Sequence, residues 1–141
     1  MSLKPYKHQK KAIKDVLETL IKDDRTQLIK SCGTGKSLVS MWIHEKFLSN
    51  LHESITILFY PSLFLVNQTY NTYKENTTLN FKPLVVCSDT AIGENEEDDI
   101  FEIDASEVKY PVSTNIEDIK LYLQDRSIKH KIVMLFSKSL I

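Results

Sequence analysis

Ser31-Cys32-Gly33-Thr34-Gly35-Lys36-Ser37 decides the fold of this 141-residue chain. The apolar run Gln27-Leu28-Ile29 precedes this stretch, and a helix-like run from Leu38 to Ile43 follows it. A strand, a glycine-rich turn and a helix opened by Lys-Ser form the layout of a phosphate-binding loop. Gly33 and Gly35 can take backbone angles closed to other residues, which lets main-chain N–H groups approach an anion closely.

The chemistry expected at this loop is nucleotide binding. The helix that begins near Lys36 would add its unpaired N–H groups and the positive end of its dipole. Lys36 is the candidate catalytic residue because it can reach the β- and γ-phosphates, and the Ser37 hydroxyl is the candidate metal ligand, for Mg²⁺. Lys30 stands where the broad pattern Gly-x-x-x-x-Gly-Lys-Ser/Thr has its first glycine. The structural alternative is a glycine turn that caps an ordinary helix, with Lys36 solvated.

Composition indicates a single globular domain that is long enough to bury a real core. The chain is 42% hydrophobic and 26% charged, with a formal net charge of −1, which argues against a strongly basic nucleic-acid binder but allows a local basic face. Cys32 and Cys87 lie far apart without metal-like spacing, so we expect reduced thiols and an intracellular location: cytoplasm, nucleus or a viral replication compartment. No apolar run approaches the roughly 20 residues of a membrane span, so no membrane partner is expected.

The hydrophobic pattern predicts alternating helices and strands. Helices are expected over 4–22, from the loop to about Ser49, from Ser62 to about Lys74, and from the capping-box sequence Thr114-Asn115-Ile116-Glu117 through Leu123. Strands are expected over Thr26–Lys30, Ser54–Tyr60, Lys82–Cys87 and Ile132–Phe136. Such alternation implies βαβ units and a parallel sheet, with the phosphate-binding loop at its carboxyl edge.

Three further stretches bear on the fold or on binding, and the last two allow more than one interpretation. The strand Ser54–Tyr60 is apolar on both faces, which suits a sheet covered by helices on both sides. The acidic run Glu94–Asp99 is expected to be an exposed loop, with a metal site as the alternative. The first helix carries an apolar stripe, and its lysines outside the stripe form either a solvated face or phosphate contacts. The stripe consists of Ile13, Val16, Leu17, Leu20 and Ile21, and the lysines are Lys7, Lys10, Lys11 and Lys14.

Four sets of motifs, in chain order, carry a family resemblance. They are Leu3–Ile13, then Ser31–Ser37, then Phe59–Leu63 with Val66–Thr69, and finally Val86–Asp89 with Pro111–Thr114 and Leu135–Ser137. The chain resembles the start of the first RecA-like motor domain of superfamily 2 helicases. Within that superfamily it is most similar to the branch of restriction-enzyme translocase subunits and related DEAD/DEAH-type proteins.

The resemblance implies roles for particular residues. Gln9 would read the adenine edge of ATP, and the loop residues Cys32, Gly33, Thr34, Gly35, Lys36 and Ser37 would hold its phosphates with Mg²⁺. Pro61, Ser62 and Gln68 would hold the nucleic-acid backbone, with DNA favoured over RNA. The alternative for Gln9 is an exposed helix residue. The alternative for Pro61 and Ser62 is a strand end and a helix cap.

Departures from the family pattern limit what this chain is expected to do alone. It lacks Asp-Glu-x-His, Ser-Ala-Thr and a second RecA-like domain, and the family's Phe-Ser-Thr-Tyr-Gln-Ser is shortened to Phe136-Ser137-Lys138-Ser139. We therefore expect residues 1–141 to form the N-terminal part of a helicase ATP-binding domain. The fold would be α/β, a parallel-sheet P-loop (RecA-like) domain with helices on both faces, incomplete at its C-terminus. Whether the chain hydrolyses ATP alone is left open.

Two other functions compete with a helicase or translocase motor fragment. One is a non-catalytic nucleotide-binding or regulatory module. A partner chain or domain that carries the missing motifs would instead indicate a motor divided between two chains. The other is a small nucleotide kinase, which is disfavoured because such an enzyme needs an arginine-rich lid and this chain has only Arg25 and Arg126.

Overall fold

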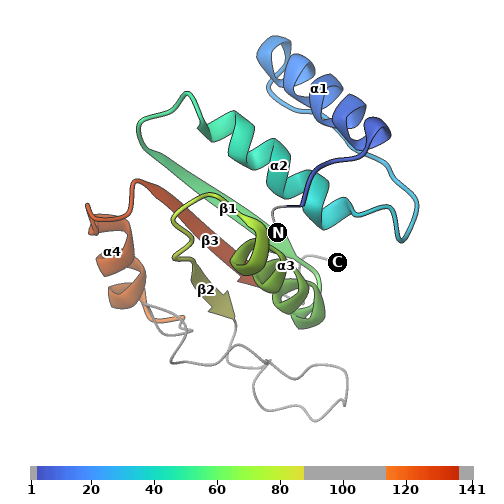
Figure 1. The fold of residues 1–141 in the computed structure, drawn as a ribbon. Coiled ribbons are helices and arrows are strands. Elements are labelled where there is room, and N and C mark those ends of the chain that lie inside the picture. Colours follow the sequence, from blue (N-terminus) through green and yellow to red (C-terminus); the bar gives the residue numbers. More distant parts are fainter. Residues whose placement is uncertain (1–2, 88–113, 137–141) are drawn as a thin grey trace.

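A parallel three-stranded sheet lies at the centre of the computed structural model, which describes residues 3–87 and 114–136 (Figure 1). The strands are β1 (Ser54–Tyr60), β2 (Leu84–Cys87) and β3 (His130–Phe136), in the spatial order β1-β3-β2. The helices are α1 (Lys7–Lys22), α2 (Lys36–Leu48), α3 (Leu63–Asn76) and α4 (Ile116–Gln124). The predicted α/β class and parallel sheet are confirmed.

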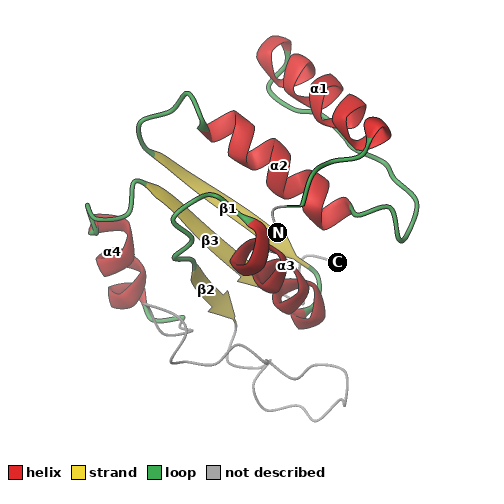
Figure 2. Ribbon diagram, viewed as in Figure 1, coloured by secondary structure: helices red, strands yellow, loops and turns green. Residues whose placement is uncertain are grey.

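The register of the sheet places β3 between two strands that precede it in sequence. Ser54 pairs with His130 and Tyr60 with Phe136, while Leu84 pairs with Val133, and both ladders are parallel. Because parallel neighbours need long crossovers, helical segments join the strands (Figure 2). All three strands therefore end at the same edge.

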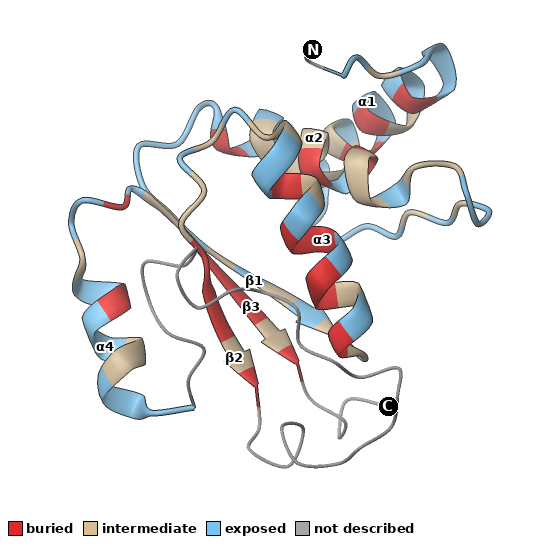
Figure 3. Cartoon of the chain, turned by 60° about the horizontal axis from the view of Figure 1, so that its bottom comes forward, coloured by how far each residue is buried: buried red, intermediate tan, exposed pale blue. Residues whose placement is uncertain are grey.

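Helices α2 and α3 cover one face of the sheet, and α1 packs on α2 as an outer layer (Figure 2). The main core lies between these helices and the strands, where buried residues gather (Figure 3). Its members include Met41, Leu63, Val66, Tyr70, Tyr73, Val85, Ile132, Met134 and Phe136. Buried Cys87 belongs to this core, and burial raises the pKa of its thiol to about 11.

Helix α4 covers the opposite face, but only over β2 and β3. Its Tyr122 is fully buried, and the tyrosine hydroxyl accepts a hydrogen bond from the Ile132 N–H at 2.8 Å. Leu84, Ile128 and Val133 complete this smaller cluster. The prediction of helices on both faces is thus confirmed.

On the α4 side of the sheet, β1 carries exposed apolar side chains, contrary to the expectation that it is buried on both faces. Ile55, Ile57 and Phe59 are 61%, 51% and 58% exposed, while the alternate residues Thr56 and Leu58 are half-buried. Residues two apart share a face of a strand, so these three side chains form one stripe. Within the described residues, β1 pairs only with β3.

The predicted strand Thr26–Lys30 is wrong. These residues have no regular secondary structure, and Ile29 is 81% exposed. A strand is stable only when its backbone groups are paired, and the described sheet ends at β1 without taking this segment as a neighbour. The local sequence favours an extended conformation, but no strand of the described sheet pairs with this segment.

Smaller differences concern the helices. Helix α1 buries Ile13 and Val16 as expected, but Ile21 at its end is exposed. All four lysines of α1 are exposed, with Lys11 2.6 Å from Asp15 and Lys14 3.6 Å from Glu18, which agrees with a solvated face, and phosphate contact by these lysines stays untested. The N-cap of α4 is Asn115, one residue later than the predicted capping box, because the Asn115 side chain accepts from the Glu117 N–H at 3.0 Å.

Several predictions fall outside the described residues: those on Ser88, Asp89, Glu94–Asp99, Pro111–Ser113 and Ser137. None of the helices in 3–87 and 114–136 combines the length and the apolar character that crossing a membrane requires.

Candidate functional site

The glycine turn before α2 has the backbone conformation that its sequence predicts. Gly33 and Gly35 have φ values of +74° and +73°, in the left-handed region that favours glycine. The Thr34 hydroxyl donates to the Ser31 carbonyl oxygen at 2.7 Å and closes the turn. Cys32 is exposed on the same turn as a free thiol.

The turn presents the N-terminus of α2 to solvent. Gly35 is the N-cap and has no side chain, so no side-chain cap satisfies the first N–H groups of the helix. Lys36 is exposed and Ser37 is half-buried, directly at this end. Because α2 leads back to the start of β1, its N-terminus lies at the edge where the strands end, as predicted (Figure 1).

Gln9 of α1 contacts the glycine turn through a side-chain hydrogen bond. Its side chain is only 4% exposed, so the alternative of an exposed helix residue is wrong. The Oε1 atom accepts from the Tyr6 N–H at 2.8 Å, and Nε2 donates to the Thr34 carbonyl oxygen at 3.3 Å. One amide thus caps α1 and contacts the glycine turn. Its role in reading adenine stays a prediction.

The two glycines of the turn differ in their surroundings. A Cβ atom on Gly35 would lie 2.9 Å from Gln9 Nε2, whereas a Cβ on Gly33 would have nothing within 4 Å. Gly35 is therefore required both by its backbone angle and by the contact with α1. Gly33 is required by its backbone angle alone.

These residues fit a phosphate chain better than they fit a metal ion alone. The uncapped N-terminus of α2 and the exposed Lys36 ammonium both favour an anion. The described residues contain no group of three or more His, Cys, Asp or Glu side chains that could hold a metal. The role of the Ser37 hydroxyl as a ligand of Mg²⁺ stays a prediction.

The predicted nucleic-acid contacts lie on the segment that follows β1. Pro61 is exposed directly after the strand, and the Ser62 hydroxyl accepts from the Leu65 N–H at 3.3 Å as the N-cap of α3. The predicted cap is thus present. Gln68 is exposed further along α3. Pro61 and Ser62 lie at the carboxyl edge with the glycine turn, and their contact with nucleic acid stays a prediction.

The sequence did not predict the polar cluster around His44. Its Nδ1 lies 3.0 Å from the Tyr73 hydroxyl, and its Nε2 lies 2.9 Å from Thr56 Oγ1. Burial is the main cause that lowers the pKa of His44, and the nearby His130 lowers it further while Glu45 opposes them. Burial also raises the pKa of Tyr73. The spacing of His44 from the buried Met41 and Leu48 on α2 was the signal available in the sequence.

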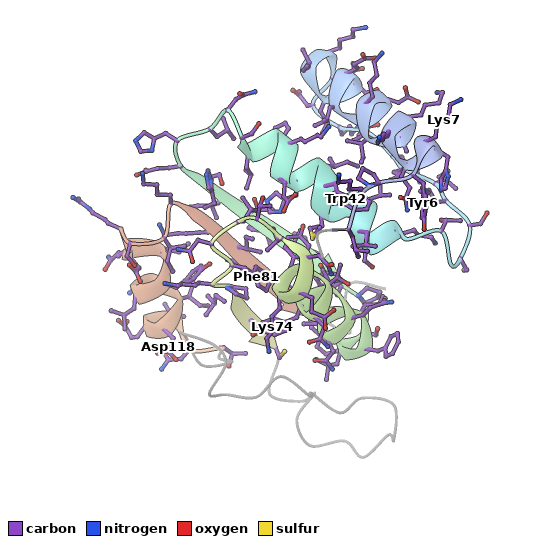
Figure 4. The ribbon with its side chains drawn as sticks, viewed as in Figure 1. Tyr6, Lys7, Trp42, Lys74, Phe81 and Asp118 are labelled. Carbon is purple, nitrogen blue, oxygen red and sulfur yellow. The ribbon has the colours of Figure 1, made fainter. Side chains whose placement is uncertain are left out.

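Helix α1 packs beside α2 (Figure 4). Tyr6 and Lys7 mark the N-terminal end of α1, which is the end that contacts the turn before α2 through Gln9. Tyr6 is exposed and stacks on His8 with ring centroids 6.0 Å apart. The aromatic pair and buried Gln9 thus lie together at the N-terminal end of α1.

Comparison with known proteins gives two kinds of match. A family model described as type III restriction enzyme, res subunit, matches residues 2–136. Among solved structures, a nuclease-deletion mutant of the Type ISP restriction-modification enzyme LlaGI, in complex with a DNA substrate mimic, is 21% identical with a TM-score of 0.74. The ATP-dependent Type ISP restriction-modification enzyme LlaBIII, bound to DNA, is 25% identical with a TM-score of 0.75.

The two structural matches differ greatly in length from this chain. They cover 95% and 96% of it, but only 13% of the LlaGI chain and 9% of the LlaBIII chain. No protein with a curated description matches.

Proposed function

Because the chain belongs to the family of the type III restriction enzyme res subunit, we propose that it is the ATP-binding N-terminal portion of a superfamily 2 translocase or helicase. Its membership agrees with the resemblance to restriction-enzyme translocases that the motifs carry. The observation that supports nucleotide binding most directly is the turn at α2, with two glycines at positive φ, an uncapped helix N-terminus and an exposed Lys36.

Each residue of the turn would have a defined part in holding ATP. Main-chain N–H groups of Gly33, Thr34 and Gly35 would face phosphate oxygens, and the Lys36 ammonium would offset charge on the β- and γ-phosphates. Ser37 would ligate Mg²⁺, which neutralises charge on these phosphates when bound. Gln9 would add adenine recognition while it holds the turn through Thr34.

Movement on DNA is the second half of the proposal. LlaGI and LlaBIII are described in complexes with DNA, and LlaBIII is described as ATP-dependent. In this chain Pro61, Ser62 and Gln68 would contact the phosphate backbone at the edge where ATP binds. Backbone contacts carry no sequence information, and DNA binding that also neutralises phosphates with lysine or arginine weakens as the salt concentration rises.

Filter binding to labelled single- and double-stranded DNA over a salt series tests this half. We expect the affinity for DNA to fall steadily as the salt concentration rises. Gln68→Glu should weaken binding because it adds a negative charge at an exposed position of α3. Gln124→Glu, which places the same charge at the end of α4, is the matched control. Absence of salt-sensitive binding, or equal effects of the two variants, would contradict the proposed contact.

A non-catalytic nucleotide-binding or regulatory module is the second candidate. Such a module would bind nucleotide at the same turn without hydrolysing it, because phosphoryl transfer needs several charge-neutralising groups at once. Phosphate release measured with and without DNA separates the two candidates. DNA-stimulated release supports the motor, and binding without release supports the module. Release that begins only when a chain with the missing motifs is added supports a motor divided between two chains.

A further inference from the structure

Lys30 carries a buried charge with no partner in the part of the chain that the structure describes. Its Nζ atom is inaccessible to solvent and has no hydrogen-bond acceptor there. The lysines of α1 behave differently, because Lys11 and Lys14 are exposed and lie beside Asp15 and Glu18. Lys30 therefore needs a separate explanation.

An ammonium group withdrawn from water without an acceptor destabilises the folded state. It has three N–H donors and a full positive charge, and buried charges in proteins are normally paired and hydrogen-bonded. An unpaired, buried ammonium is thus a place where an oxyanion from outside the described residues would be bound strongly. The chemistry that would satisfy it is a phosphate or a carboxylate.

The position of Lys30 favours phosphate. It directly precedes Ser31, whose carbonyl oxygen accepts the hydrogen bond that closes the glycine turn. The four-carbon stem of lysine starts one residue from that turn and is flexible. Lys30 thus stands on the chain entering the turn and Lys36 on the chain leaving it, at the start of α2.

We propose that Lys30 is a second cationic ligand for the phosphates of the nucleotide bound at this turn. The proposal rests on the proposed nucleotide binding and adds a residue to it. In the ligand-free protein the Lys30 charge opposes folding, and in the complex it contributes to affinity. Removing the charge should therefore change stability and affinity in opposite directions, which a purely structural lysine would not do.

The test uses Lys30→Met, which keeps an unbranched, flexible side chain of nearly the same length and removes its charge, and Lys30→Arg, which keeps the charge. Lys129→Met is the matched control, because Lys129 is exposed just before β3, at the opposite edge of the sheet. Thermal unfolding without nucleotide and titration of a fluorescent ATP analogue with Mg²⁺ are measured for each variant and for Lys36→Ala.

We expect Lys30→Met to raise the unfolding midpoint by a few degrees and to weaken nucleotide binding by about tenfold or more. Lys30→Arg should retain more of the affinity than Lys30→Met, and Lys129→Met should change neither quantity. If Lys36→Ala loses binding while Lys30→Met binds as wild type, Lys30 is not a phosphate ligand. A lowered midpoint for Lys30→Met would show that the Lys30 charge stabilises the ligand-free protein, and this would contradict the inference. A wild-type protein that binds no nucleotide would overturn the proposed function, and the phosphate role with it.

Discussion

Gln9 Nε2 donates to the carbonyl oxygen of Thr34 at 3.3 Å and so connects the first helix to the centre of the glycine turn. The same amide caps α1 through the Tyr6 N–H. The conformation of the turn therefore depends on α1 as well as on its own glycines. Gly35, which would bring a Cβ within 2.9 Å of Gln9 Nε2, is the position where both requirements meet.

Substituting alanine for the two glycines should separate backbone strain from this contact. Gly33→Ala should cost about 1–2 kcal/mol of unfolding free energy, because alanine at positive φ is strained but meets no neighbour. Gly35→Ala should cost about 1 kcal/mol more, because Gln9 must also give up its hydrogen bond to Thr34. Urea unfolding of both variants measures the difference.

A Gln9→Ala background provides the control for that comparison. In it the two glycine substitutions should cost the same, since the contact that distinguishes them is gone. If the extra cost of Gly35→Ala persists without the Gln9 side chain, its cause is not the Gln9 contact.

Stability should fall as the pH drops below about 6.5, the ordinary pKa of histidine, because of His44. Its pKa is lowered in the folded protein, mainly by burial, so between the folded and unfolded pKa values the unfolded chain binds more protons. The contribution is complete above the unfolded pKa and is lost as the pH falls toward the folded pKa. His44→Gln should flatten this dependence in urea unfolding at pH 5 to 8, whereas the exposed His52→Gln should leave it intact. Identical pH profiles for wild type and His44→Gln would refute the assignment.

The exposed stripe of Ile55, Ile57 and Phe59 should make the chain associate with itself as concentration rises. Among residues 3–87 and 114–136, β1 has a neighbour only on its β3 side, and an uncharged strand with a free side and apolar side chains is a site for pairing and aggregation. Ile57→Lys should reduce the association seen in sedimentation velocity. Ile21→Lys replaces another exposed isoleucine, at the end of α1, and should have little effect. Equal effects of the two variants, or a wild type that stays monomeric, would contradict this role of β1.

Sequence patterns predicted the parts of the fold that local chemistry determines. The strand Ser54–Tyr60 was predicted with its observed bounds, because β-branched and aromatic residues are followed directly by Pro61 and the capping Ser62. The glycine turn and the start of α2 were predicted because only glycine adopts positive φ freely.

Features that depend on distant neighbours could not be predicted in the same way. Thr26–Lys30 has the composition of a strand, but composition does not report whether a pairing partner is present. The apolar residues of β1 look buried on both faces, yet α4 covers only β2 and β3. The burial of Gln9 depends on contacts between α1 and the turn, which are remote in sequence.

Calorimetric titration of ATP with Mg²⁺ into wild type and Lys36→Ala tests the central claim most directly. The claim is that the turn from Ser31 to Ser37 binds the phosphates of a nucleotide. We predict saturable one-site binding to the wild type that weakens at least tenfold in Lys36→Ala, while both proteins retain the same far-UV spectrum and unfolding midpoint. Absence of wild-type binding, or equal affinity in the two proteins, would contradict the claim and leave the turn with a structural role.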